Sequence, residues 1–136
     1  MSSVATPLKE KVEQFLSGVK KLYINGEFVK SASEKTFDTP NPATGEVLAT
    51  VYEAQEEDID RAVKAAREAF DNGPWSKLTP AERSRLMYKL ADLMEENKEE
   101  LAQLETLDNG KPIRETLNAD VPLAIEHFRY YAGWTT

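Results

Sequence analysis

The chain has 136 residues, with 17 Lys and Arg against 24 Asp and Glu, and a formal net charge of −7. This acidic balance opposes binding to nucleic-acid phosphates and to anionic membrane surfaces, so we expect neither as a partner. The chain contains no cysteine, which excludes disulfides, thiolate metal sites and a thiol nucleophile among these residues.

The N-terminal third predicts one short helix followed by extended segments. Leu8, Val12 and Val19 belong to a set of apolar residues at helical spacing, which predicts an amphipathic helix over residues 8–19. Alternating residues then predict three extended pieces: a hairpin over 21–30, a brief strand over 36–39 and a strand over 46–52. The last strand is apolar on both faces, so we expect other elements to cover both of its sides.

The next two segments predict helices with marked ends. Apolar residues recur at helical spacing over 59–70, and we expect the helix to stop at Gly73 in the left-handed conformation. Thr79 and Glu82 have the spacing of a capping box, with Pro80 at the first helical position. This combination predicts the start of the following helix at residue 80.

Two more helices complete the chain. Asn97 and Glu100 predict a second capping box, which opens a helix that ends at Gly110. The last helix contains Pro122, which lacks a backbone N–H and is expected to kink or restart it. No internal repeat or flexible linker interrupts these elements, so residues 1–136 are expected to form a single segment. Its predicted class is α+β and helix-rich, with an N-terminal β-hairpin and strand followed by amphipathic helices.

Few polar clusters in the chain indicate chemistry by themselves. The six glycines are scattered and form no phosphate-binding loop. His127 is the only histidine, and it is interpreted as structural rather than catalytic. The carboxylates of residues 56–58 open a helix, where negative charge is favoured by the helix dipole, so we interpret them as solvated capping charges rather than acid–base pairs.

Three motifs resemble a known family. They are NPATGEV at 41–47, LETLDNGKP at 104–112 and RYYAGW at 129–134, and together they resemble the N-terminal part of NAD(P)-dependent aldehyde dehydrogenases. The resemblance covers residues 22–134 in the order and at the spacing of the family. It implies that the chain is part of the larger α/β, Rossmann-like fold of that family, in the N-terminal part of its cofactor-binding domain.

The resemblance also implies a reaction whose parts are absent from this chain. In the family, an activated cysteine attacks the aldehyde, a hydride passes to NAD or NADP, and a glutamate promotes hydrolysis to the carboxylic acid. The chain has no cysteine, no recognisable base and no glycine-rich cofactor turn. We therefore assign no catalytic or cofactor-binding residue to it and expect the chain alone to be inactive.

Asp108 is expected near the C-terminal end of a helix, where the helix dipole disfavours an anion, so it needs a compensating partner. Lys111 and the loop amides could supply it. The resemblance implies another answer, a structural monovalent cation held by Asp108 with backbone oxygens of Thr39 and Pro40. Both alternatives remain open on the sequence.

The last helix resembles the one that lines the aldehyde tunnel in the family. The matching positions are Ala119 and Leu123, which lie one helical turn apart and so share a face. Ordinary core packing would need the same two apolar residues. The sequence does not distinguish these two roles.

A rival hypothesis is a stand-alone helical interaction module without catalysis. Such a domain should bury its apolar faces internally, whereas part of a larger enzyme should not. The residues that distinguish the two are Val47, Val51, Phe70, Leu90, Phe128 and Tyr131. The remaining expectations are an aldehyde as substrate of the full-length enzyme, a homo-oligomer, and a cytoplasmic location, because the N-terminus has no signal-peptide core.

Overall fold

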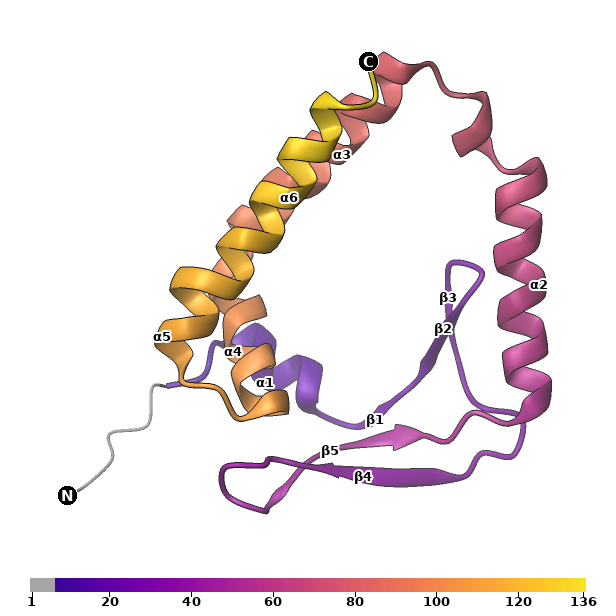
Figure 1. Cartoon of the computed structure of the whole chain (residues 1–136). Coiled ribbons are helices and arrows are strands. Elements are labelled where there is room, and N and C mark those ends of the chain that lie inside the picture. The colour runs from indigo at the N-terminus through magenta and orange to yellow at the C-terminus, as the bar shows by residue number, and fades with distance from the viewer. Residues whose placement is uncertain (1–6) are drawn as a thin grey trace.

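The computed structural model describes residues 7–136. Figure 1 shows the N-terminal elements at the base of the molecule, with helices rising on two sides. The first elements, in chain order, are α1 (Glu10–Leu16), β1 (Val19–Lys20), β2 (Leu22–Ile24), β3 (Glu27–Val29), β4 (Thr36–Pro40) and β5 (Val47–Tyr52). The extended segments expected from the sequence are therefore present, with the hairpin formed by β2 and β3.

The first helix is shorter than its periodicity predicts. It ends at Leu16, and the prediction was wrong for Val19, which begins β1 instead. Gly18 has a φ of +65°, a conformation that turns the chain out of the helix and is open to glycine without strain. β1 then pairs in parallel with β5, so backbone pairing with a distant strand replaces the expected final helical turn.

A three-stranded sheet has the order β1-β5-β4, with β4 antiparallel to β5. β5 is its central strand, and only Ala49 within it is buried. The expectation of cover on both faces is not met by the described residues, because Val47 is 62% exposed.

Helices make up the rest of the chain. Their bounds are α2 (Glu56–Asn72), a 3₁₀ turn η1 (Pro74–Lys77), α3 (Pro80–Glu96), α4 (Lys98–Asn109), α5 (Ile113–Glu115), a π turn η2 (Thr116–Asp120) and α6 (Val121–Gly133). The capping box at the start of α3 is confirmed: Thr79 N–H donates to the Glu82 carboxylate at 2.8 Å, and Glu82 N–H donates to Thr79 Oγ1 at 3.3 Å. The expected restart at Pro122 is also confirmed, since α6 begins at the residue before it.

Two predicted helix ends were wrong in detail. Gly73 has a φ of −65° and is not left-handed. A Cβ at this position would lie 2.1 Å from the Ala69 carbonyl oxygen, so glycine is required by a close backbone approach. Asn97 does not cap α4; its side-chain amide donates to the Leu93 carbonyl at 2.8 Å and so caps the end of α3.

Asp58 is not a solvated capping charge, because its side chain is only 1% exposed. Its carboxylate accepts the N–H of Gln55 at 3.0 Å and the N–H of Ala32 at 3.1 Å. These backbone donors, first that of Gln55 and then that of Ala32, hold the pKa of the Asp58 carboxyl below its usual value. Asp58 therefore joins the start of α2 to the segment that follows the hairpin.

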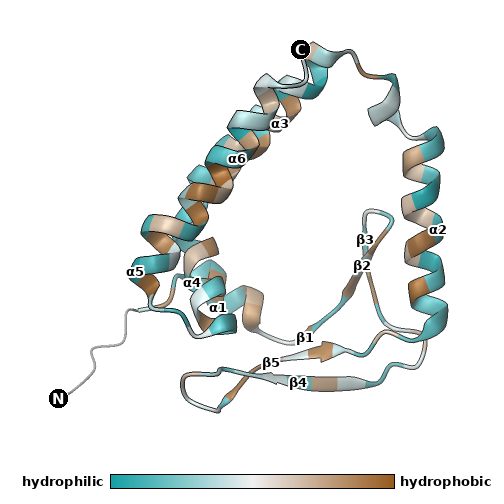
Figure 2. Cartoon of the chain, in the orientation of Figure 1, coloured by the Kyte–Doolittle hydropathy of each residue, from teal (hydrophilic) through white to brown (hydrophobic). Residues whose placement is uncertain are grey.

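The buried core is small and lies between α3, α4 and α6. α3 and α6 run side by side in Figure 1. The buried members of the cluster are Ala91, Ala102, Val121 and Ile125. α2 stands apart from these helices, and Figure 2 shows that it carries hydrophobic residues along its length. Phe70 on α2 is 75% exposed, so a large apolar area is uncovered in the described part of the chain.

Candidate functional site

The loop that follows α4 has a defined backbone conformation. Gly110 takes a φ of +79° and donates its N–H to the Thr106 carbonyl at 3.0 Å, which closes the helix. Asn109 Oδ1 accepts the N–H of Lys111 at 2.8 Å. A Cβ on Gly110 would lie 3.0 Å from Pro42 Cγ. The structure thus brings LDNGKP against the turn of the NPATGEV motif, although the two are far apart in sequence.

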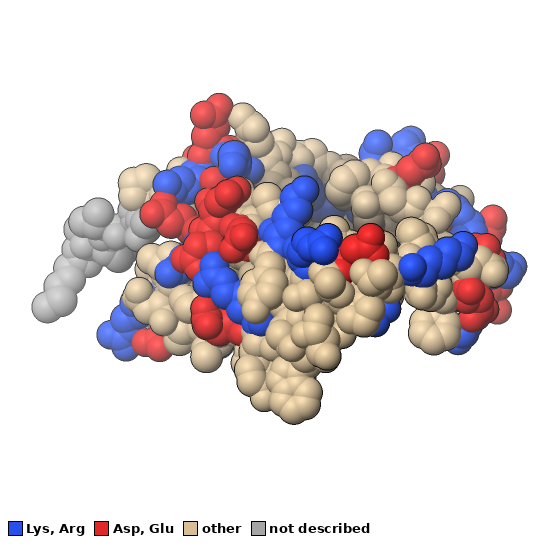
Figure 3. Space-filling view, turned by 90° about the horizontal axis from the view of Figure 1, so that it is seen from above, with Lys and Arg blue, Asp and Glu red and all other residues tan. Residues whose placement is uncertain are grey.

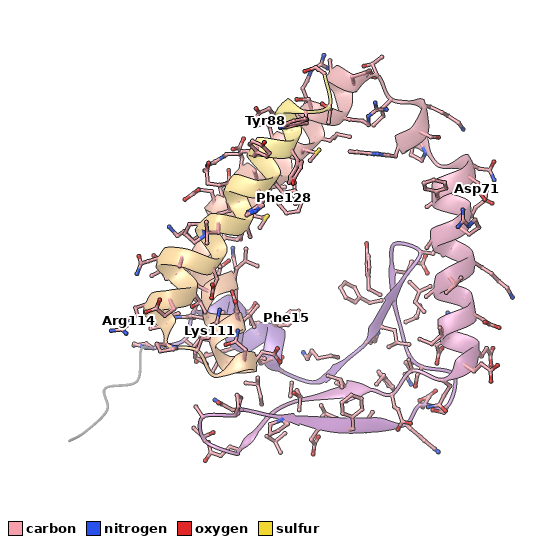
Figure 4. The ribbon with its side chains drawn as sticks, in the orientation of Figure 1. Phe15, Asp71, Tyr88, Lys111, Arg114 and Phe128 are labelled. Atoms are coloured by element: carbon pink, nitrogen blue, oxygen red, sulfur yellow. The ribbon has the colours of Figure 1, made fainter. Side chains whose placement is uncertain are left out.

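Lys111 does not compensate Asp108. Its ammonium donates to the Asp120 carboxylate at 2.6 Å, across to the end of the π turn. This hydrogen bond raises the pKa of Lys111 above its usual value. Figure 4 places Lys111 in the loop beside the start of the last helical segment. Lys111, the lysine nearest to Asp108 in the sequence, therefore pairs with Asp120 instead.

Asp108 and Thr39 line the same cavity, which has a volume of about 350 Å³. Glu105 and Lys20 also reach it, and the rest of its wall is apolar, made by Phe15, Leu16, Leu48, Ala49, Val51 and Leu104. Pro40 is not among the lining residues; it lies in β4, where the register with β5 shifts. Of the three residues implied as cation ligands, the fold therefore places two at one cavity and the third next to one of them in sequence.

The oxygen-bearing residues Thr39, Glu105 and Asp108 at this cavity are of the type that hard cations bind, but Lys20 adds a positive charge to the same wall. Within residues 7–136, no group of three or more His, Asp or Glu side chains gathers as a divalent or transition-metal site would require. These residues would supply only part of the ligands of a monovalent cation.

The two expected tunnel residues lie on either side of the α6 start. Ala119 is half-buried within the π turn, and Leu123 is 57% exposed in the first turn of α6. Leu123 borders a shallow cavity of about 240 Å³ with Glu126, His127, Tyr130 and Tyr131. His127 itself is exposed, and its Nδ1 lies 2.7 Å from the Leu123 carbonyl oxygen, a contact within one helical turn. Leu123 is consequently not a core residue within the described chain.

Thr116 is the main residue that the sequence did not reveal. Its side chain is fully buried, and its Oγ1 lies 3.1 Å from the Ala102 carbonyl oxygen and 2.8 Å from Thr106 Oγ1. A threonine that follows Arg114 and Glu115 in the sequence has no pattern that indicates such burial. The sequence also did not predict the pairing of Lys111 with Asp120, because Pro112 and most of a π turn lie between the two residues.

The described residues do not fit a dinucleotide cofactor. Only α2 follows a strand closely, which is the arrangement that presents a helix N-terminus to phosphates. Its first turn carries Glu56, Glu57 and Asp58, whose charges repel phosphate, and the buried Asp58 accepts the free backbone N–H of Gln55. The start of α2 is therefore not suited to hold a phosphate group.

Comparisons with known proteins identify relatives over almost the whole chain. The sequence profile of the aldehyde dehydrogenase family matches residues 28–136. DhaS of Bacillus subtilis strain 168, named as a candidate aldehyde dehydrogenase, is 71% identical over 136 residues, which are 100% of this chain and 28% of that protein. The mitochondrial aldehyde dehydrogenase family 2 member B4 of Arabidopsis thaliana is 60% identical over 113 residues, or 83% of this chain and 21% of that protein.

Solved structures agree with these relatives. An aldehyde dehydrogenase from Bacillus cereus, solved as an NAD⁺ complex, is 62% identical and superimposes with a TM-score of 0.90 over 94% of this chain and 26% of that one. An NAD-dependent aldehyde dehydrogenase from Sinorhizobium meliloti gives 39% identity and a TM-score of 0.80 over 92% of this chain and 24% of that one. The chain spans about a quarter of the length of these relatives, at their N-terminal part. It belongs to the aldehyde dehydrogenase family.

Proposed function

We propose that this chain is the N-terminal part of an NAD(P)-dependent enzyme that oxidises aldehydes to carboxylic acids. The observation that carries the proposal is the family match over residues 28–136, in a chain that spans about a quarter of the length of its relatives. The missing thiol and the acidic start of α2 support the proposal that the nucleophile and the NAD or NADP site lie outside these residues. We propose that this chain contributes part of the scaffold and one wall of the aldehyde path.

The rival hypothesis of a stand-alone module has little support. Of the side chains that such a module should bury, Val47, Phe70, Leu90 and Tyr131 are 62%, 75%, 42% and 55% exposed. The other two, Val51 and Phe128, are half-buried, and Phe128 packs against the core cluster. Burying apolar surface is the main driving force for folding, so these faces favour a larger assembly.

The purified chain is expected to have no dehydrogenase activity, because it has no thiol to attack an aldehyde. The measurement is NAD(P)H formation from small and aromatic aldehydes at high protein concentration, and the full-length enzyme is the positive control. Turnover by the chain that survives repeated purification would contradict both the inactivity and the assignment of the nucleophile to other residues.

In the full-length enzyme, we propose that Asp108 and the backbone oxygens of Thr39 and Pro40 hold a monovalent cation, and that Ala119 and Leu123 line the aldehyde path. The cavity shared by Thr39 and Asp108 supports the first assignment, and the exposure of Leu123 supports the second.

Potassium is expected to stabilise the wild-type enzyme more than an Asp108→Asn variant. A ligand at 100 times its Kd stabilises the folded state by about 2.7 kcal/mol, and loss of the carboxylate should remove most of this gain. Melting temperatures in KCl and in choline chloride at equal ionic strength provide the measurement. Asp60→Asn, at an exposed position on α2, is the charge-matched control. Equal potassium responses in wild type and Asp108→Asn would refute the cation site.

The chain is also expected to self-associate, because uncovered apolar faces and a short open sheet invite pairing with another copy. Sedimentation velocity over a hundredfold dilution tests this. A monomer at every concentration, without dye binding to apolar surface, would contradict the prediction. For the full-length enzyme we propose a homo-oligomer.

The remaining partners follow from charge and from the relatives. Acidic and basic side chains interleave on the face in Figure 3, and the net charge is −7, so we propose no nucleic-acid or membrane partner. Within residues 7–136, no helix is long and apolar enough to cross a bilayer. We propose a cytoplasmic location; relatives carry both cytosolic and mitochondrial names. Their names also include benzaldehyde and betaine aldehyde dehydrogenases, so the aldehyde stays unspecified.

A further inference from the structure

A π turn separates α5 from α6. It spans Thr116–Asp120, and Pro122 follows two residues after its end. Proline cannot donate to the carbonyl four residues earlier, and its ring crowds that carbonyl, so the backbone widens before it. π turns inside helical segments occur frequently at functional sites. This turn contains Ala119, and Leu123 lies three residues after its end, in the first turn of α6.

The first residue of the turn is anchored from inside the fold. Thr116 is fully buried, with its Oγ1 3.1 Å from the Ala102 carbonyl oxygen of α4 and 3.1 Å from the Ile113 carbonyl oxygen. Thr106 Oγ1 lies 2.8 Å away and can donate its proton while Thr116 donates its own to a carbonyl. The buried hydroxyl of Thr116 and the half-buried hydroxyl of Thr106 therefore attach the turn to α4 by directional bonds.

The last residue of the turn is anchored from the surface. Asp120 accepts from Lys111 at 2.6 Å, and its side chain is 28% exposed. Lys111 is held in turn by the bond between its N–H and Asn109 Oδ1 at 2.8 Å, beyond the left-handed Gly110. The LDNGKP loop thus fixes the end of the π turn.

Anchors at both ends fix the rotation of the residues that follow. In a regular helix each residue turns the chain by about 100°, so one additional residue in a turn redirects all later side chains by about that angle. A relaxation of the turn to α-helix would therefore change where Ala119 and Leu123 point. The direction of the Ala119 and Leu123 side chains therefore depends on the contacts that hold the two ends of the π turn.

We infer that Thr116 and the Lys111–Asp120 pair are positioning residues for aldehyde size selectivity: they hold the π turn that orients Ala119 and Leu123. This inference rests on the proposed function, in which those two residues line the aldehyde path.

The test uses a Thr116→Val variant of the full-length enzyme, which keeps the side-chain shape and removes the hydroxyl. The ratio of kcat/KM for a bulky aromatic aldehyde to that for acetaldehyde is expected to change about tenfold, the scale on which apolar pockets discriminate by size. KM for the nicotinamide cofactor should stay unchanged, and Thr116→Ser should restore the wild-type ratio. Thr36→Val, exposed at the start of β4, is the matched control.

Lys111→Met provides a second, surface variant if Thr116→Val fails to fold, with Lys89→Met on the exposed side of α3 as its control. It should change the same ratio in the same direction. Equal losses of kcat/KM for both aldehydes, or unchanged ratios, would overturn the inference.

Leu123→Phe separates this inference from the proposed function. If Leu123→Phe changes the aldehyde ratio while the anchor variants do not, only the positioning role is wrong. If Leu123→Phe also leaves the ratio unchanged, the assignment of the aldehyde path is wrong, and the positioning role is refuted with it.

Discussion

An Ile125→Ala substitution is expected to lower the free energy of unfolding of the chain by about 2–5 kcal/mol, the range measured for such deletions in packed cores. Ile125 is 1% exposed and belongs to the cluster between α3, α4 and α6. The cost combines the lost transfer of the side chain from water with the cavity left behind. Because this core is small, few neighbours can move to fill that cavity.

Chemical denaturation followed by circular dichroism measures the effect. Leu123→Ala is the matched control, since it removes a similar apolar side chain from the same helix at a position that is 57% exposed. The control should change stability by less than about 0.5 kcal/mol in the chain alone. Equal effects of the two variants would show that α6 is not packed on α3 and α4 as described.

An Asp58→Asn variant is expected to lower the melting temperature by roughly 5 °C, a large change for a chain of this size. The substituted side chain would be neutral and would bring an amide N–H₂ group against the N–H groups of Gln55 and Ala32, which Asp58 now accepts. Because the Asp58 side chain is buried, the substituted amide would lie against these N–H groups with little access of water to its own position. Asp60→Asn, exposed in the same helix turn, should have little effect.

The effect of Asp58 should also depend on pH. The pKa of Asp58 in the folded chain is lowered from the ordinary value of 3.8. The stabilisation of the folded state by the ionised carboxylate is therefore fully present above pH 3.8. This stabilisation is lost as the pH falls from about 3.8 through the pKa of Asp58 in the folded chain. Protonation neutralises the carboxylate of the wild type, which then resembles the neutral side chain of the variant. The difference in stability between wild type and Asp58→Asn should be constant near neutral pH and shrink below pH 3.8. A difference that grew on acidification would contradict the lowered pKa.

Local signals explain the features that the sequence determined. The start of α3 was predicted correctly because its capping box is completed within three residues, from Thr79 to Glu82. The end of α4 at Gly110 and the restart near Pro122 follow from the backbone preferences of glycine and proline, which act at one position. The family resemblance likewise rested on contiguous motifs, and the profile match over residues 28–136 confirmed it.

Tertiary structure decided the features that depend on distant partners. Val19 joined a strand because β5 offers a parallel neighbour, and Asp58 became buried because Ala32, 26 residues earlier, supplies its N–H. Position 73 needs glycine because the Ala69 carbonyl approaches too closely for a Cβ. Thr116 is buried because its hydroxyl finds hydrogen-bond partners on α4. The sequence by itself thus determined the family and most helices and strands, since these are encoded locally, whereas β1 and the π turn were not predicted. The shared cavity of Thr39 and Asp108 and the anchored π turn required the fold, since burial and hydrogen bonding between remote segments exist only after the chain has packed.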